Sequence, residues 1–368
     1  MIERRRMLVL CPFPEGVAAG QRLKYEQYFD DWRLQGWQID VSSFMDMDLW
    51  GVAYQKGYFG RKILGVLRGH VRRLRDLARV HRYALVYVFM WVTPMGSSFM
   101  ERAVRRLARK LVYDVEDNVV LGQALPRGYN PNALIARLKG PGKATFLIRN
   151  ADHIIASSPY LRDMCLQQYG ACASTYISSS VDTSRFLPRN QNTRGKITIG
   201  WTGTFSSRIY LDALRKVFQE LAERTDFRLR LIGNFEYELP GVDLEVIQWS
   251  KEREVQDLQG IDIGVYPLPQ DDWVLGKSGL KAIQYMAIGL PTVASDAGMT
   301  PMIIRNGENG LLVRDSKEWI AALERLINDP ELRRRMGRAA RKDAVAKYSL
   351  EVIRCQYRGV LRDVIARD

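Results

Sequence analysis

Short apolar runs alternate with amphipathic segments along the first half of the chain. Residues 7–10 form a run of the buried-strand type, and a loop and an amphipathic helical pattern from about Gln21 follow it. Further runs of this type occupy residues 37–44, 84–92, 110–113 and 153–156. Strands that alternate with helices in this way predict a parallel, doubly wound α/β sheet.

The same alternation starts again after a polar stretch at residues 188–196, which has the composition of a linker. The pattern predicts strands at residues 197–201, 227–232, 244–247, 261–266 and 291–294, and helices at about 210–224 and 279–288. This is the pattern of a second Rossmann-like unit. Asp329 followed by Pro330 predicts the start of a further helix. We therefore predict an N-terminal domain at 1–187, a linker at 188–196, a C-terminal domain at 197–345, and a C-terminal helix at 346–368 that packs back on the N-terminal domain.

Length and composition agree with two globular domains. The chain has 368 residues, of which 46% are hydrophobic and 26% are charged, so disorder is not expected. No apolar run reaches the roughly 18 residues of a membrane-spanning helix, and no secretory signal is present. We expect a cytoplasmic protein that associates peripherally with the inner face of the cell membrane. The four cysteines form no CxxC pair and the three histidines do not cluster with them, so we expect no metal site.

Positive charge is concentrated in the first half of the chain. Residues 1–187 hold 27 Lys and Arg against 16 Asp and Glu, whereas the remainder holds 28 against 25. This excess predicts an acidic partner: an anionic membrane surface, a phosphorylated ligand or nucleic acid. Because no nucleic-acid recognition motif is present, we expect no nucleic acid.

Two groups of arginines recur at helical spacing in this basic half. The first is Arg68, Arg72, Arg75 and Arg79, beside the apolar residues Ile63, Leu67, Val71, Leu74 and Ala78, and the second is Arg102, Arg105, Arg106 and Arg109. Helices of this composition lie on anionic lipid. A solvated surface face is the alternative interpretation.

Residues 276–313 carry the clearest functional pattern. Gly276, Lys277, Ser278 and Gly279 form a small loop that opens a helix, and Lys281 follows in its first turn. Free backbone N–H groups at a helix start, with two lysines beside them, make an anion site. A glycine and a proline end the helix, and a buried strand follows. The carboxyl end of a parallel sheet is where open α/β folds bind ligands.

This segment resembles the donor-binding signature of the retaining glycosyltransferases of GT-B family 4. The family pattern E-(A/Y)-M-A-x-G-x-P-V-V-A-(S/T), followed by D-G-x-N-G-(L/F)-L-V, is similar to residues 284–295 and 306–313. Residues 199–204 and 151–186 carry weaker resemblances. The resemblance implies a GT-B fold, with two Rossmann-like domains that face each other across a cleft. The N-terminal domain would hold the acceptor and the C-terminal domain the nucleotide-sugar.

The resemblance also implies site residues. The glycine-rich loop after the first strand passes near the donor phosphates or the acceptor in this family, so Gly16, Gly20 and Arg22 are candidates. A diphosphate suits a clamp of Arg208 with Lys277 and Lys281. The remaining candidate donor contacts are Gly203, Thr204, Ser278, Gly279, Leu280 and Gln284.

The chain departs from the family pattern at three glutamates. The first falls at Gly276, the second, which binds the ribose, falls at Gln284, and a third falls at about Met302. A glutamine both donates and accepts hydrogen bonds, so ribose binding is retained in this interpretation. These changes leave open a non-catalytic member that binds a glycan or a partner. A sugar-nucleotide epimerase, another enzyme of GT-B-like fold, is a second alternative.

Acidic residues suggest two further sites. Asp114 and Asp117 follow a predicted strand, where they would bind acceptor hydroxyls or assist their deprotonation. Asp46 and Asp48 match the Asp-x-Asp metal motif of the other main glycosyltransferase fold, an interpretation that the two-domain pattern disfavours. By resemblance we expect transfer of a sugar with retention from a UDP- or GDP-linked donor to a glycan or lipid-linked acceptor hydroxyl. We expect no metal and no further cofactor, and a role in bacterial surface polysaccharide or glycoconjugate assembly.

Overall fold

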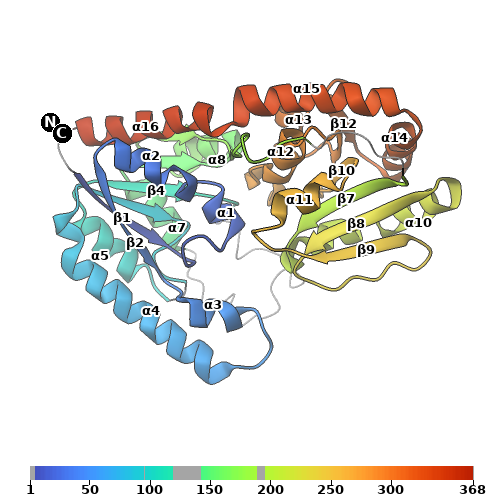
Figure 1. The fold of residues 1–368 in the computed structure, drawn as a ribbon. Helices are drawn as coiled ribbons and strands as arrows, with labels where there is room; N and C mark the ends of the chain where they lie inside the picture. Colours follow the sequence, from blue (N-terminus) through green and yellow to red (C-terminus); the bar gives the residue numbers. More distant parts are fainter. Residues whose placement is uncertain (1–4, 95, 119–141, 189–194, 368) are drawn as a thin grey trace. The chain divides into compact units, whose positions relative to one another are not determined.

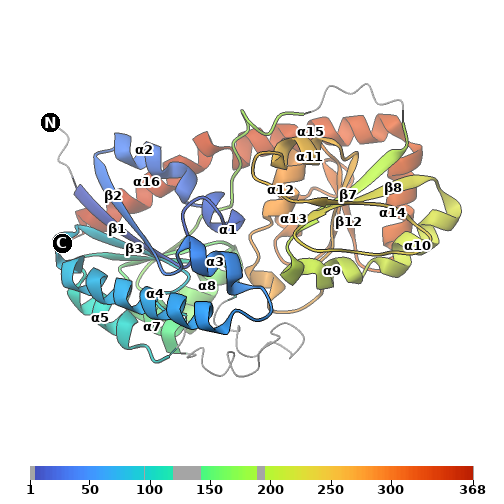
Figure 2. The same ribbon diagram turned by 60° about the horizontal axis from the view of Figure 1, so that its bottom comes forward.

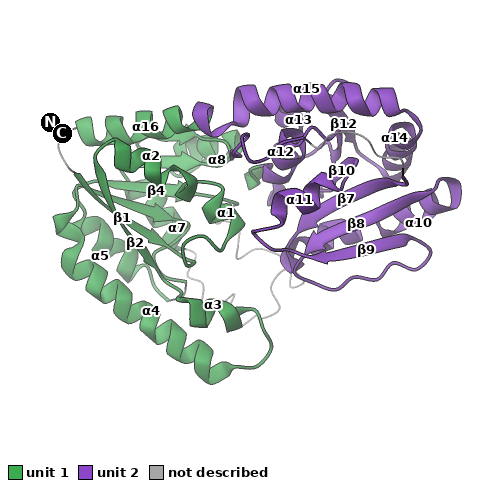
Figure 3. Cartoon of the chain, in the orientation of Figure 1, with its two compact units in different colours: residues 1–178, 275–278, 353–368 green, residues 179–274, 279–352 purple. Residues whose placement is uncertain are grey.

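A computed structural model describes residues 5–94, 96–118, 142–188 and 195–367. The chain forms two compact units, shown in Figure 3: unit 1 comprises residues 1–178, 275–278 and 353–368, and unit 2 comprises residues 179–274 and 279–352. The chain therefore returns to unit 1 twice, briefly at Leu275 and finally at Ile353. Most of the predicted linker, from 189 to 194, lies outside the described residues.

The sheet of unit 1 has six strands among the described residues, all paired in parallel in the order β2-β1-β3-β4-β5-β6. The strands are β1 (Arg5–Cys11), β2 (Trp37–Ser43), β3 (Leu85–Phe89), β4 (Leu111–Val115), β5 (His153–Ala156) and β6 (Ser174–Tyr176). The central strands β3 and β4 are buried along their whole length, as expected for a parallel sheet covered on both faces. The direction of strand addition reverses between β1 and β3, and such a reversal opens a ligand crevice at the carboxyl edge.

Helices cover both faces of this sheet, with α2 and α16 on one face and α4, α5 and α7 on the other (Figures 1 and 2). The helices are α1 (Ala19–Arg22), α2 (Phe29–Leu34), α3 (Met47–Ala53), α4 (Phe59–Arg79), α5 (Phe99–Leu107), α7 (Gly142–Asn150), α8 (Pro159–Asp163) and α16 (Leu350–Ala366), with short turns η1 (Glu26–Tyr28), η2 (Val80–Arg82) and η4 (Met164–Gln168). The ring of Tyr357 in α16 lies 4.9 Å from that of Tyr28, and Arg358 pairs with Asp31. From Ile353 onward, the last described helix is thus part of unit 1.

The sheet of unit 2 is also parallel, and its described strands follow the order β12-β11-β10-β7-β8-β9. The strands are β7 (Ile197–Gly203), β8 (Phe227–Gly233), β9 (Asp243–Gln248), β10 (Ile263–Tyr266), β11 (Thr292–Ser295) and β12 (Gly310–Val313). The helices are α9 (Arg208–Asp212), α10 (Arg215–Arg224), α11 (Glu254–Gln259), α12 (Leu280–Ala287), α13 (Thr300–Ile303), α14 (Ser316–Asn328) and α15 (Pro330–Tyr348), with the turns η5 (Phe205–Ser207) and η6 (Val274–Gly276). Strand addition reverses between β7 and β10, and open α/β sheets bind ligands at the carboxyl ends of the strands where this reversal occurs.

The predicted alternation of strands and helices is confirmed in both units. Asp329 caps α15 as expected, because its carboxylate accepts a hydrogen bond of 2.8 Å from the Leu332 N–H. The single helix predicted at 210–224 is wrong: the chain breaks between Asp212 and Arg215 into α9 and α10. Strands β6 and β12 were not predicted.

Candidate functional site

The loop after β1 in unit 1 is braced by its own side chains. Gly16 has a φ of +80°, and its N–H donates a 2.8 Å hydrogen bond to Glu26 Oε2. The Gln21 side-chain amide donates to the Phe13 carbonyl at 3.0 Å, and its oxygen accepts from the Phe13 N–H at 3.4 Å. The predicted residue Arg22 is buried in α1 directly after the loop. The loop is therefore held in one shape at the point where strand addition reverses.

Asp114, predicted to act on the acceptor, is completely buried near the end of β4. One carboxylate oxygen lies 2.5 Å from Lys24 Nζ, and the other accepts a hydrogen bond from the Tyr87 hydroxyl. Lys24 and Tyr87 are themselves buried. These contacts make Asp114 the centre of a structural ion pair, and direct contact with an acceptor does not fit this burial.

Glu116, which no sequence motif singled out, lies at the carboxyl end of β4 against the start of α1. A Cβ at the predicted site residue Gly20 would lie only 3.0 Å from Glu116 Oε2. Burial is the main cause that raises the pKa of Glu116 to about 7; the carboxylates of Asp117 and Asp114 act in the same direction, whereas nearby lysines act against it. A carboxyl group whose pKa lies near neutral pH is suited to proton exchange with a ligand.

Lys277 and Asp117, both predicted site residues, lie together in unit 1. Lys277 Nζ is 3.3 Å from Asp117 Oδ1. Asp117 has a φ of +56°, a left-handed conformation that aspartate tolerates better than most residues. The segment that carries Lys277 is anchored by two serines after β5, since Ser157 Oγ donates to the Gly276 carbonyl at 3.2 Å and Ser158 Oγ donates to the Leu275 carbonyl at 2.9 Å.

The absence of a side chain at position 276 has a steric cause. A Cβ there would lie 2.5 Å from the backbone nitrogen of Asn118 and 2.8 Å from the carbonyl carbon of Asp117. Both contacts are with backbone, which cannot rotate away as a side chain does. A larger side chain at position 276, such as the glutamate that the resemblance implies there, would therefore require this backbone to move.

In unit 2, the loop after β7 is ordered by a capping arrangement. The Thr204 N–H donates to Ser207 Oγ at 3.1 Å, and Lys281 Nζ lies 3.4 Å from the same hydroxyl. Lys281 also lies over the face of Trp201, 4.8 Å from the ring centroid. The structure thus brings Lys281 of α12 to the loop of the predicted residues Gly203 and Thr204.

Arg208 begins α9 directly after this loop. Its side chain is half exposed and forms an ion pair of 3.5 Å with Asp212. Helix α12 begins at Leu280 as predicted, after Gly279 with a φ of +73°. Because Lys277 and Ser278 belong to unit 1 and Arg208 and Lys281 to unit 2, the predicted diphosphate clamp stays a prediction.

Gln284, which the resemblance predicts to bind the ribose, is accompanied by a carboxylate from another helix. Its side-chain nitrogen lies 3.4 Å from Glu254 Oε1 at the start of α11, and Glu254 is only 3% exposed. Arg185 lies 3.8 Å from the other oxygen of Glu254. Glu254 precedes Gln284 by 30 residues, so no local motif indicated the pair.

Asp46 and Asp48 have structural partners. Asp46 caps α3 by accepting from the Leu49 N–H at 2.9 Å, and Asp48 lies 3.4 Å from Arg68. In the part of the chain that the structure describes, no group of three or more His, Cys, Asp or Glu is placed to hold a metal ion. No helix in the same residues is long and apolar enough to cross a bilayer.

Comparison with known proteins matches a stretch that lies mostly in unit 2 to a family of transferases. Residues 196–329 match the family model "Glycosyl transferases group 1". The D-inositol 3-phosphate glycosyltransferase of Corynebacterium aurimucosum is 26% identical over 255 residues, which are 60% of this chain and 59% of that protein. The MMP alpha-(1->4)-mannosyltransferase of Mycolicibacterium hassiacum is 28% identical over 201 residues, or 51% and 47% of the two chains. The matched part of the chain thus spans less than two thirds of the length of either relative.

Solved structures match along the whole chain. Sucrose-phosphate synthase from Thermosynechococcus elongatus superposes with a TM-score of 0.74 at 18% identity, covering 100% of both chains. HepE from Anabaena, in complex with UDP-glucose, superposes with a TM-score of 0.64 at 15% identity, covering 98% of this chain and 100% of that one. The expected GT-B fold is confirmed, and so is the recognition of a family 4-like glycosyltransferase domain.

Proposed function

We propose that this chain, which has the GT-B fold and a Glycosyl transferases group 1 domain, transfers a sugar from a nucleotide-diphosphate sugar to an acceptor hydroxyl. The observation that carries the proposal is that the family match at 196–329 includes the whole donor segment at 276–313. The relatives are named as a glycosyltransferase and a mannosyltransferase. A similar fold that holds UDP-glucose supports a UDP-linked donor, with a GDP-linked donor as the alternative base.

On the donor side, unit 2 supplies groups suited to a nucleotide diphosphate. Lys281 and Arg208 offer positive charge to phosphate oxygens, and the start of α12 offers backbone N–H groups. Gln284 with Glu254 offers an amide and a carboxylate to the ribose hydroxyls. These cations and the helix dipole offset the charge of the leaving diphosphate, so no metal is needed for the transfer. The sugar would be transferred with retention, the diphosphate oxygen itself accepting the acceptor proton.

On the acceptor side, unit 1 supplies Glu116 and the Lys277–Asp117 pair. Near neutral pH a protonated Glu116 would donate a hydrogen bond to a sugar hydroxyl beside Gly20 of α1. Lys277 is paired with Asp117 at 3.3 Å and would turn to the diphosphate as negative charge develops there. The acceptor would be a glycan or a lipid-linked glycan, in the assembly of bacterial surface polysaccharide or glycoconjugates.

A thermal-shift screen over UDP- and GDP-sugars tests the donor assignment. A ligand present at about 100 times its Kd adds about 2.7 kcal/mol to the free energy of unfolding, so the cognate donor is expected to raise Tm. No shift with any nucleotide-sugar would contradict donor binding. If a nucleotide-sugar binds and is isomerised without an acceptor, the protein is an epimerase. If it binds but no nucleoside diphosphate is released with a full acceptor pool, the chain is a non-catalytic member, the outcome that Gly276 and Gln284 would then explain.

A further inference from the structure

Most aliphatic residues of helix α4 lie on the side that faces away from the sheet of unit 1, whereas Leu77 packs against the core. Five aliphatic side chains on this side are each between 46% and 62% exposed, and we call them the α4 stripe: Ile63, Leu64, Leu67, Val71 and Leu74. With about 3.6 residues per turn, these positions share one side of the helix, and the buried positions lie on the opposite side. The amphipathic pattern of α4 is therefore inverted relative to that of an ordinary surface helix.

The inward side of α4 is small and polar. Gly65 and Gly69 face Leu49 and Phe44 so closely that a Cβ on either glycine would come within 2.8 Å of them. Below them, Arg73 and Asp76 form an ion pair of 3.0 Å in which neither side chain is more than 1% exposed. A polar inward side explains why the aliphatic residues have no place in the core.

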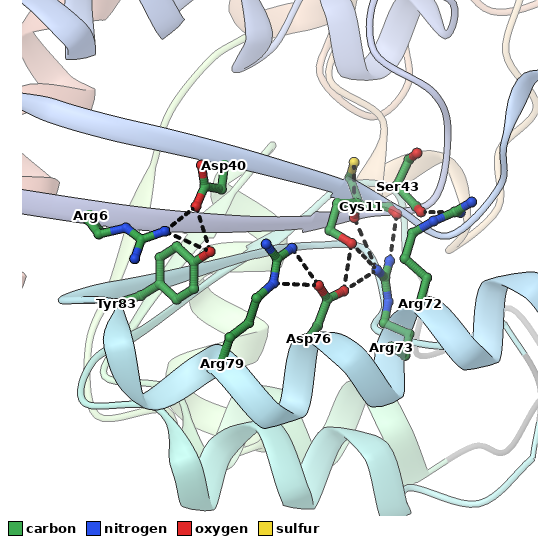
Figure 4. Close-up of polar contacts among 10 residues, drawn as sticks. Arg6, Cys11, Asp40, Ser43, Arg72, Arg73, Asp76, Arg79 and Tyr83 are labelled. Carbon is green, nitrogen blue, oxygen red and sulfur yellow. Dashed lines mark hydrogen bonds and ion pairs between the residues drawn. The ribbon is translucent and has the colours of Figure 1, made fainter.

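Arg73 reaches from α4 into a polar network that includes Cys11 and Asp76, which Figure 4 shows. Arg73 donates to the carbonyls of Cys11 at 2.9 Å, Ser42 at 3.1 Å and Val92 at 2.8 Å. Rotating α4 to bury its stripe would remove this guanidinium from three carbonyls and leave them without these donors. Breaking a buried ion pair of this kind is strongly unfavourable, so the stripe stays outside.

Two of the four arginines predicted to contact lipid are committed to unit 1. Arg72 donates to the carbonyls of Ser43 and Phe44, both at 2.8 Å, and Arg79 donates to Asp76 at 2.8 Å. Arg68 pairs at 3.4 Å with Asp48 but stays exposed, and so do Arg75 and, nearer the start of the helix, Arg61; the three lie along one side of the stripe. The predicted contact of this helix with lipid stays a prediction, and the aliphatic side chains listed with the arginines are among the exposed groups of the helix.

We propose that the α4 stripe inserts into the interfacial region of an anionic lipid bilayer, with Arg61, Arg68 and Arg75 against the lipid phosphates. Exposed apolar surface bordered by cations, on a helix of 21 residues, has the composition of an interfacial membrane helix. The first residues of α4 extend the apolar surface, since Phe59 is 76% exposed and Tyr58 before it is 50% exposed. Aromatic residues favour the boundary between headgroups and acyl chains.

A second copy of the chain fits this surface less well than a bilayer. A helix of 21 residues is about 30 Å long and about 10 Å wide, which gives a face of roughly 300 Å². A stable dimer buries about 800 Å² on each partner. The like-charged arginines beside the stripe would also meet across a two-fold interface.

The α4 stripe would be the surface through which the enzyme reaches a lipid-linked acceptor. Membrane binding itself does not depend on the proposed function, and only the identity of the acceptor rests on it.

Vesicle co-sedimentation of the full chain tests the proposal without any transferase assay, so the two proposals can fail separately. The stripe variant is Leu64→Ser/Leu67→Ser/Leu74→Ser, and a matched control replaces three exposed apolar residues elsewhere: Leu166→Ser/Val345→Ser/Val352→Ser. With vesicles of phosphatidylcholine and phosphatidylglycerol, the stripe variant is expected to bind at least about tenfold more weakly, and the control like the wild type. Equal binding by the stripe variant and the control would overturn the proposal.

Two further readouts identify the occupant. A Cys172→Ser/Cys355→Ser protein carrying an environment-sensitive dye on Leu67→Cys is expected to show a blue shift on addition of the same vesicles, and an unshifted spectrum overturns insertion. Arg61→Glu/Arg68→Glu/Arg75→Glu is expected to abolish the preference for vesicles with phosphatidylglycerol over phosphatidylcholine alone. If the wild type instead forms a dimer that the stripe variant dissociates, and binds no vesicles, a second copy is the occupant and the proposal fails.

Discussion

Gly276→Ala is expected to destabilise unit 1, because the added methyl group meets backbone on two sides. The new Cβ would lie 2.5 Å from Asn118 N and 2.8 Å from the Asp117 carbonyl carbon, well inside van der Waals contact. The segment 275–278 must then move away from Asp117, which strains the hydrogen bonds of Ser157 and Ser158 to it. Overpacking of this kind costs about 2 kcal/mol, which lowers Tm by roughly 4–8 °C in a unit of this size.

Differential scanning calorimetry of the full chain measures this effect, with Gly359→Ala as the control. Gly359 lies in α16, and apart from its chain neighbours and the nearby backbone of this helix no atom comes within 4 Å of the place that an alanine methyl group would take there. Alanine at this position is therefore expected to be neutral or to stabilise by about 0.5–1 kcal/mol. Gly276→Glu, which restores the family residue, is expected to lower both Tm and turnover. A Gly276→Ala protein with an unchanged or raised Tm would refute the steric explanation for the missing glutamate.

Three further changes probe the site and the fold. Lys277→Ala is expected to lower nucleotide release by about 100-fold with little change in Tm. The control Lys196→Ala, at an exposed ion pair, is expected to leave turnover unchanged. Equal turnover in both variants would exclude Lys277 from the site. Burial raises the pKa of Glu116 from its ordinary 4.5 to about 7 in the folded chain, so its ionisation lowers the free energy of unfolding as pH rises through this interval. In urea unfolding across pH, Glu116→Gln is expected to be more stable than wild type above pH 7 and equally stable below about pH 4.5. A stability difference independent of pH would refute the raised pKa. Arg73→Met is expected to cost about 3 kcal/mol in urea unfolding, against less than about 0.5 kcal/mol for the exposed Arg75→Met, and similar values for the two would contradict the buried network under α4.

The sheets could be predicted because buried parallel strands are continuous apolar runs. Residues 7–10 and 153–156 indicate β1 and β5 without any knowledge of their neighbours. Strand β6 (Ser174–Tyr176) is short, polar and half-buried, so it lacks that signal. The break between α9 and α10 also has no marker, since no glycine or proline stands between Asp212 and Arg215.

The donor segment could be predicted because its residues are local in sequence, but the partners that define the site are not. Glu116 owes its raised pKa to burial and to charged residues brought to it by tertiary packing. Glu254 reaches Gln284 from a different helix. The composition of α4 indicated an amphipathic helix, yet only the packing of Arg73 and Asp76 reveals which side faces the sheet. Side-chain burial of this kind depends on contacts distant in sequence.

Transfer itself is the most direct test of the central claim that this chain is a glycosyltransferase. The purified chain is incubated with each radiolabelled UDP- and GDP-sugar and a bacterial lipid and glycan extract, and both nucleoside diphosphate and labelled acceptor are quantified. We predict that one donor yields the two products in equal amounts, and that release depends on the extract. A donor that binds yet yields no labelled acceptor in any extract, or that is converted without an acceptor, would contradict the assignment.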